Sequence, residues 1–121
     1  MPTKRILLAS AFAIAAATAT RAQAHAKLES SEPQAAAALD VAPKQIRLKF
    51  NEALEPAFSK IKLTDASYTE VSLPPAKVDA ADASTMSVPA PALRVGNYHV
   101  QWSTMTHDGH KAKGEFVFTV K

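Results

Sequence analysis

The chain has 121 residues, no cysteine, and 14 lysines and arginines against 11 aspartates and glutamates. The absence of cysteine excludes a disulfide framework, a thiolate metal site and a lipid anchor attached to cysteine. Three of the basic residues and none of the acidic ones precede residue 25, so residues 25–121 are formally neutral. They offer no excess of positive charge for nucleic acid binding.

The first 24 residues have the features of a cleaved secretory signal peptide. Two basic residues precede an apolar run at residues 6–19, which is too short to span a bilayer and argues against a permanent membrane anchor. Small residues at Ala22 and Ala24 suit cleavage after Ala24. We expect residues 1–24 to be removed and residues 25–121 to form one exported domain that begins with His25. Cleavage after Ala19 is the alternative, and it would leave residues 20–24 ahead of the histidine.

The exported domain is rich in segments where apolar residues occupy every second position, a pattern typical of half-buried strands. The predicted strands, weaker candidates included, are residues 27–31, 45–50, 60–64, 69–73, 84–88, 98–102 and 115–120. Prolines and one Gly-Asn pair separate them. The alanine run at 35–38 is expected to form a short helical turn, and residues 74–87 a loop.

About seven short strands joined by turns predict an all-β fold, a small antiparallel β-sandwich of immunoglobulin-like or cupredoxin-like Greek-key type. Without disulfides, such a domain depends on its hydrophobic core. The expected core residues are Leu28, Ile46, Leu48, Phe50, Phe58, Ile61, Leu63, Val71, Leu73, Val88, Val100, Trp102, Phe116, Phe118 and Val120.

Chemistry-bearing residues gather in the sequence Thr-His-Asp-Gly-His at 106–110, between two strong strand predictions. Asp108 and His110 are two residues apart, so in an extended chain both side chains lie on one face, and Gly109 permits a tight bend. An ordinary polar turn explains the same residues when they are considered alone. His107 is the alternative to His110 as a ligand, but it is adjacent to Asp108 and should point to the opposite face. His99 is expected to be a solvent-facing strand residue.

An N-terminal His25 changes this assessment, because its α-amine and its imidazole Nδ1 can chelate one metal ion. An N-terminal amine has an ordinary pKa near 7.7–8.0, so a metal displaces its proton at little cost. With Asp108 and His110, the set becomes three nitrogens and one oxygen. Such a set in tetragonal geometry suits Cu(II), whereas zinc favours a tetrahedron. We therefore predict one Cu(II) per chain, bound by His25, Asp108 and His110.

Three segments of the sequence resemble the CopC family of periplasmic copper-binding proteins. They are HAKLESSEP at the start of the exported domain, IRLKFNEAL at 46–54 and GNYHVQWSTMTHDGHKAKGEFVFTV at 96–120. The resemblance covers essentially all of residues 25–121. It implies a β-sandwich with a Cu(II) site at His25, Asp108 and His110. It also places Glu52 where the family has a glutamate near that site, as an orienting or additional ligand, although a surface acid at a strand end is an equal alternative.

One departure from the family concerns methionine. Some members carry a methionine-rich loop for Cu(I), because thioethers favour the reduced ion. The exported domain has only Met86 and Met105, which are more typical of core filling. We therefore predict a Cu(II)-only type. Trp102 is expected to pack beneath the site.

The resemblance implies a periplasmic copper carrier or buffer in copper homeostasis and resistance, which is not an enzyme. An inner-membrane copper transport protein of the same system is the implied partner, and we expect the carrier to be a monomer. Two alternatives stay open: a monooxygenase with a copper brace formed by two histidines, and a structural immunoglobulin-like module. The size of the domain, the expected carboxylate ligand and the scarcity of aromatic residues argue against the monooxygenase.

Overall fold

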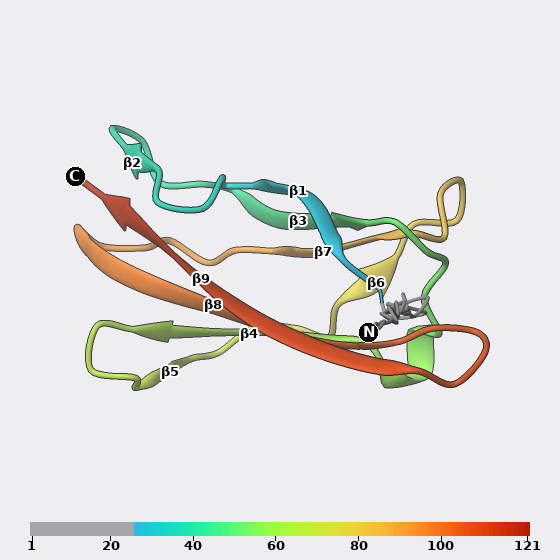
Figure 1. Cartoon of the computed structure of the whole chain (residues 1–121). Coiled ribbons are helices and arrows are strands. Elements are labelled where there is room, and N and C mark those ends of the chain that lie inside the picture. Colours follow the sequence, from blue (N-terminus) through green and yellow to red (C-terminus); the bar gives the residue numbers. More distant parts are fainter. Residues whose placement is uncertain (1–25) are drawn as a thin grey trace, which may run out of the picture.

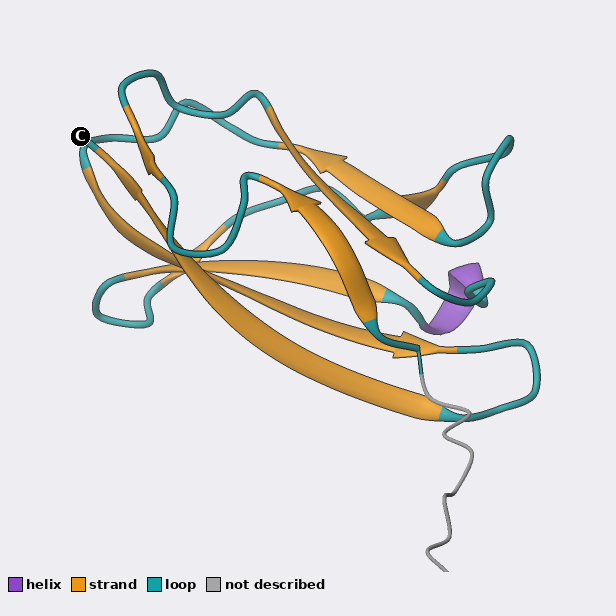
Figure 2. Ribbon diagram, turned by 45° about the horizontal axis from the view of Figure 1, so that its top comes forward, coloured by secondary structure: helices purple, strands orange, loops and turns teal. Residues whose placement is uncertain are grey.

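The computed structural model describes residues 26–121, so the predicted signal peptide and His25 lie outside the described part of the chain. Within it, nine strands and one short 3₁₀ helix form two layers (Figures 1 and 2). These elements are β1 (Leu28–Glu32), β2 (Ala38–Leu39), β3 (Gln45–Phe50), η1 (Pro56–Phe58), β4 (Lys60–Asp65), β5 (Glu70–Val71), β6 (Lys77–Val78), β7 (Thr85–Pro89), β8 (Gly96–Met105) and β9 (Lys111–Val120).

The strands form two sheets that face each other. One has four strands in the order β1-β3-β7-β6, and the other has five in the order β2-β9-β8-β4-β5. All neighbours are antiparallel except β2 and β9, which are parallel. The predicted β-sandwich is therefore confirmed, with nine strands in place of about seven. The two additional strands, β2 and β6, are two-residue pairings that are too short to produce an alternating pattern in the sequence.

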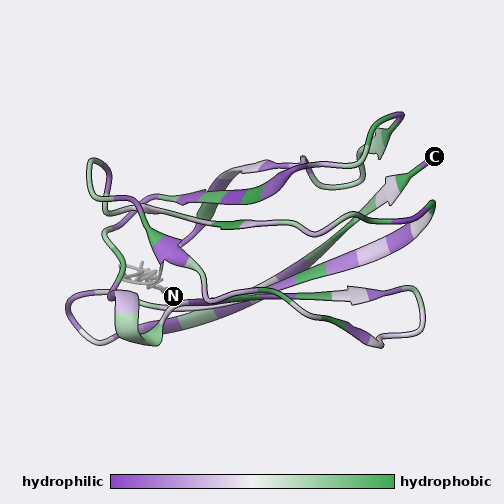
Figure 3. Cartoon of the chain, turned by 180° about the vertical axis from the view of Figure 1, so that it is seen from behind, coloured by the Kyte–Doolittle hydropathy of each residue, from purple (hydrophilic) through white to green (hydrophobic). Residues whose placement is uncertain are grey.

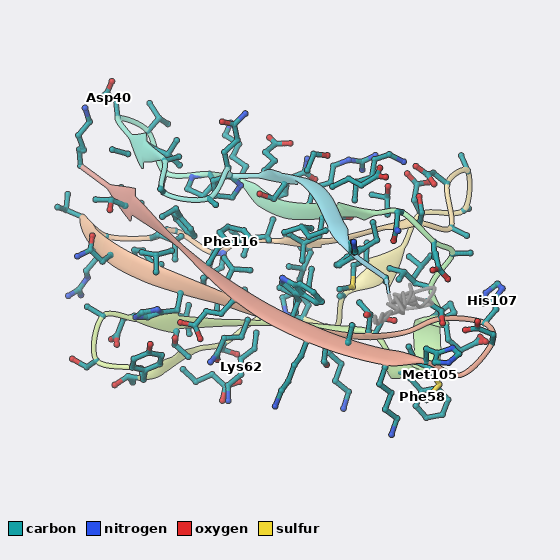
Figure 4. All side chains as sticks on the ribbon, in the orientation of Figure 1. Asp40, Phe58, Lys62, Met105, His107 and Phe116 are labelled. Carbon is teal, nitrogen blue, oxygen red and sulfur yellow. The ribbon has the colours of Figure 1, made fainter. Side chains whose placement is uncertain are left out.

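The core lies between the sheets and follows the period-two pattern that predicted it (Figure 3). On β3, Ile46, Leu48 and Phe50 are at most 1% exposed, while the residues between them are not buried. Phe116 of β9 points into the same layer (Figure 4). Alternate side chains of a strand leave on opposite faces, so each strand buries one side and exposes the other.

Three expectations about local structure were wrong. Phe58 is 57% exposed instead of buried, because it lies in η1, where the alternation of the neighbouring strands does not apply. The alanine run does not form a helical turn: Ala36 has a φ of 66° and its N–H bonds to Val117 of β9, and the chain continues as β2. A helix of one turn gains too little to compete with such pairing. Finally, the expected loop at 74–87 contains β6 and the start of β7.

The β8–β9 hairpin fixes where the candidate metal ligands lie. Its strands are ten residues each and pair without a break from Gly96 opposite Val120 to Met105 opposite Lys111. This pairing carries the connecting loop, residues 106–110, to one end of the sandwich, at the right in Figure 1. No helix among residues 26–121 is long and apolar enough to cross a membrane.

Candidate metal centre

The loop at 106–110 is closed by its own backbone. The N–H of Thr106 donates to the carbonyl of His110 at 2.9 Å, and the N–H of Gly109 donates to the carbonyl of Thr106 at 2.9 Å. Gly109 has a φ of 89°, a conformation that glycine adopts at little cost and that a side chain would strain. The bend therefore brings Asp108 and His110 together, as the sequence predicted.

Asp108 and His110 form a close pair at the surface of this loop. Their Oδ1 and Nδ1 atoms are 3.1 Å apart, and the two side chains are 53% and 48% exposed. The same carboxylate oxygen accepts a hydrogen bond from the hydroxyl of Thr106, which is buried. This hydroxyl, and then His110, lower the pKa of Asp108 to about 2. Asp108 is therefore an anion at neutral pH and is already oriented.

A second segment, residues 51–55, supports the loop from the side; we call it the bridging segment. Leu54 pairs with Thr106 in an isolated β-bridge, and the N–H of Glu55 donates to the carbonyl of Met105 at 2.8 Å. Leu54 is itself fully buried, which anchors the segment in the core. The loop is thus fixed to the body of the protein as well as to its own hairpin.

The bridging segment also holds the start of the described chain. The N–H of Lys27 donates to Oδ1 of Asn51 at 2.7 Å, and the N–H of Asn51 donates to the carbonyl of Lys27 at 3.1 Å. Ala26 is buried, with 3% exposure. Five consecutive residues therefore connect the chain immediately after residue 25 to the base of the loop that bears Asp108 and His110. These two parts of the chain are far apart in the sequence, so the sequence alone does not reveal that they are connected.

The other predicted residues are less directly involved. Glu52 lies in the bridging segment and is partly buried, but within residues 26–121 no three histidine, aspartate or glutamate side chains come together as a metal-binding group. His107 is exposed at the tip of the loop (Figure 4). The structure thus brings two of the predicted ligands together, Asp108 and His110, and the third, His25, lies outside the described residues.

Sequence reasoning missed a second histidine–carboxylate cluster on the same hairpin. His99 lies on the outward face of β8, yet its side chain is only 15% exposed, because the ring of Tyr68 stacks on it at 4.0 Å. Its Nδ1 is 2.9 Å from Oε2 of Glu115, and Glu115 also accepts hydrogen bonds from Tyr68 and Gln101. Tyr68 follows β4, far from His99 in sequence, so no local pattern signals this contact.

The aromatic and sulfur-containing residues have mainly structural contacts. Trp102 packs edge-on against Phe50, with ring centroids 5.0 Å apart, and lies across Gly114 of the neighbouring strand. Met86 is fully buried, which confirms the expected core role, and Met105 is partly buried next to the loop. In residues 26–121 the candidate centre therefore offers one carboxylate and one imidazole, donors that suit Cu(II) better than a soft, sulfur-seeking ion.

Comparison with known proteins places the chain in a family. A model described as the CopC domain matches residues 28–121. YobA from Escherichia coli K12 is 39% identical over 99 residues, which cover 81% of this chain and 80% of YobA.

Two solved structures are similar in fold and in sequence. CopC from Methylosinus trichosporium OB3b has a TM-score of 0.76 and 33% identity, covering 80% of this chain and 94% of that one. PcoC, a methionine-rich copper resistance protein from Escherichia coli, has a TM-score of 0.68 and 39% identity, covering 81% and 100%. Neither the monooxygenase alternative nor the structural-module alternative is supported by these matches. The chain belongs to the CopC family of copper resistance proteins, which bind copper and are not enzymes.

Proposed function

We propose that this protein is a periplasmic Cu(II) carrier or buffer in copper homeostasis and resistance. In this proposal, removal of residues 1–24 exposes His25, whose α-amine and imidazole bind one Cu(II) together with Asp108 and His110. Glu52 orients the set or adds a ligand. The carrier acts as a monomer and exchanges its ion with an inner-membrane copper transport protein of the same system.

The observation that carries the proposal is the connection between the two ends of the domain. Asp108 and His110 are paired at 3.1 Å on a loop that the bridging segment ties to Lys27. Residue 25 directly precedes the buried Ala26, so the α-amine and the imidazole of His25 would start beside this same bridging segment. Ligands that are held in place before the metal arrives lose less conformational entropy on binding, which favours tight and selective uptake.

The oxidation state follows from the available donors. Amine, imidazole and carboxylate ligands favour Cu(II), whereas Cu(I) prefers thioethers. Only two methionines lie after residue 24, and Met86 is buried in the core, where it cannot reach a surface ion. PcoC, by contrast, is described as methionine-rich. In this proposal the donor set of the centre holds Cu(II) rather than the reduced ion.

The decisive experiment tests maturation and binding together. Intact mass spectrometry of protein exported to the periplasm should give a chain that begins at His25, and Cu(II) titration should give one ion per chain. The matched control is the same chain with Ala24 retained, which moves the amine away from the imidazole. We expect that control to bind Cu(II) at least about 100-fold more weakly, since losing a direct ligand costs more than losing an orienting partner. Equal affinity of the two chains would refute the N-terminal ligand, and absence of stoichiometric binding would refute the function.

A further inference from the structure

The outward face of the five-stranded sheet carries a concentration of lysines beside the candidate metal centre. Strand register sets their arrangement: Lys60 and Lys113 lie on either side of Ser103. Lys62 lies one step further along β4 from Lys60, on the same face. At the other end Lys111 is opposite Met105. Figure 4 shows Lys62, Met105 and Phe58 on the side of this sheet that faces away from the other sheet.

This face is hollowed. One hollow of about 560 Å³ is lined by Lys60, Lys62, Ser103 and Lys113, among others. A second, of about 420 Å³, shares Lys60, Ser103 and Lys113 and adds Phe58, Met105 and Lys111. Because they share these residues, the two hollows are neighbours, and we call them together the lysine groove. Its end is apolar, since Phe58 is 57% exposed and Met105 lies beside it.

Three lysines of the lysine groove are not neutralised by a carboxylate of the described residues. Lys60, Lys62 and Lys113 have no carboxylate partner among residues 26–121, and the only acid that borders the groove, Glu115, is bonded to Tyr68, His99 and Gln101. On the opposite sheet two of the cations are paired, Arg47 with Asp79 at 3.5 Å and Lys49 with Asp82 at 3.0 Å. A domain with equal numbers of acids and bases thus places Lys60, Lys62 and Lys113, without carboxylate partners among the described residues, on one face.

The groove reaches the loop that bears the candidate ligands. Met105 and Lys111, which line its apolar end, are the residues immediately before and after the loop at 106–110. A molecule seated in the groove would therefore lie beside the base of the loop that bears Asp108 and His110. This position suits a partner that exchanges an ion with the loop.

We propose that the lysine groove docks an acidic segment of the protein partner with which this chain exchanges copper. Carboxylates of the segment would face Lys60, Lys62 and Lys113, and an apolar side chain would contact Phe58 and Met105. A hollow suits a polypeptide segment better than the flat surface of a membrane, which calls for protruding cations. Complementary charge accelerates encounter and fixes orientation more than it adds affinity, as an exchange partner requires. The nature of the partner rests on the proposed copper function, whereas the acidic docking does not.

The test uses ¹⁵N-labelled protein, residues 25–121, titrated with a short peptide of glutamates around one leucine and followed by NMR. We expect amide shifts at 60–62, 101–105 and 111–113, and weaker binding at higher salt because exposed charges are screened. The double variant K60E/K113E should bind about tenfold more weakly, and the control K44E/K77E, which makes the same change in net charge, should bind like the wild type.

Three outcomes would overturn the proposal: no shifts at these amides, equal weakening in both double variants, or stronger shifts with vesicles of anionic lipid than with the peptide. Copper binding is measured separately on each variant. K60E/K113E should keep the wild-type Cu(II) affinity, because it leaves the loop intact. Peptide binding that persists in a chain without Cu(II) uptake would retain the docking groove while refuting the carrier function, so the two failures are distinguishable.

Discussion

The β8–β9 hairpin carries two histidine–carboxylate pairs of similar length and different surroundings. His110 and Asp108 are 3.1 Å apart at the loop, with side chains 48% and 53% exposed. His99 and Glu115 are 2.9 Å apart on the strands, with side chains 15% and 36% exposed. An imidazole and a carboxylate, at nearly the same distance, therefore form one open and one closed cluster.

The difference lies in what surrounds each carboxylate. Both oxygens of Glu115 accept hydrogen bonds, from Gln101 on one side and from Tyr68 and His99 on the other, and the Tyr68 ring covers His99. This cluster is complete without a ligand. Asp108 is held mainly through one oxygen, Oδ1, on a loop that projects from the sandwich. Accessibility and the number of partners, rather than residue type, identify the pair that suits a metal ion.

The largest expected effect is a difference in Cu(II) affinity between variants of the two histidines. Replacing His110 with alanine removes a proposed ligand and should weaken Cu(II) binding at least about 100-fold, more than the loss of an orienting partner. Replacing His99 with alanine should leave the affinity within about twofold, because its cluster is already satisfied. Competition titration against a chelator of known affinity measures both. Equal losses in H99A and H110A would contradict the distinction between the clusters.

An intermediate effect is expected on stability, from a substitution in the β8–β9 strands that carry both pairs. A methyl group at Gly114 would clash with Cζ2 of Trp102 and lie 2.8 Å from its Cε2, and the indole is confined by Phe50. G114A should therefore lower the free energy of unfolding by about 1–3 kcal/mol, the usual cost of overpacking a core. Urea denaturation followed by circular dichroism measures it. The folded fraction should still bind Cu(II), because Gly114 lies outside the loop at 106–110, three strand pairs from the Met105–Lys111 pair that closes it.

The double variant W102F/G114A serves as the control for that prediction. The smaller ring leaves room for the methyl group, so the double variant should recover part of the stability that G114A loses. If the double variant loses as much unfolding free energy as the two single variants lose together, Trp102 and Gly114 do not interact as described.

The smallest expected effect concerns protons released by copper. The pKa of Asp108 is lowered from its ordinary value of 3.8 to about 2. The side chain therefore keeps its negative charge until the pH falls through about 2. Between pH 6 and 4 it therefore binds almost no proton, so the proton competition that releases copper in this range does not involve Asp108. D108N should weaken binding but leave the slope of log Kd against pH unchanged. A slope reduced in D108N would show that Asp108 titrates in this range.

The sequence anticipated most of the fold because period-two patterning and burial have the same physical origin. Ile46, Leu48 and Phe50 alternate with polar residues, and they are the residues that the sheet buries. The pattern failed where pairing with a distant strand decides the local structure, as at β2, which the parallel bonds to β9 create. It also failed at Phe58, where a short 3₁₀ helix interrupts the alternation.

The candidate site divides in the same way. The sequence by itself determined the Asp108–His110 pair, because a two-residue spacing around Gly109 is a local property of the backbone. Only the tertiary structure decided that Lys27 and Thr106 share one support, that Tyr68 closes over His99, and that Lys60 and Lys113 flank one groove. Each of these contacts joins residues far apart in the chain. Such contacts depend on strand register and sheet order, which hydrogen bonding across the whole sandwich fixes and no local pattern encodes.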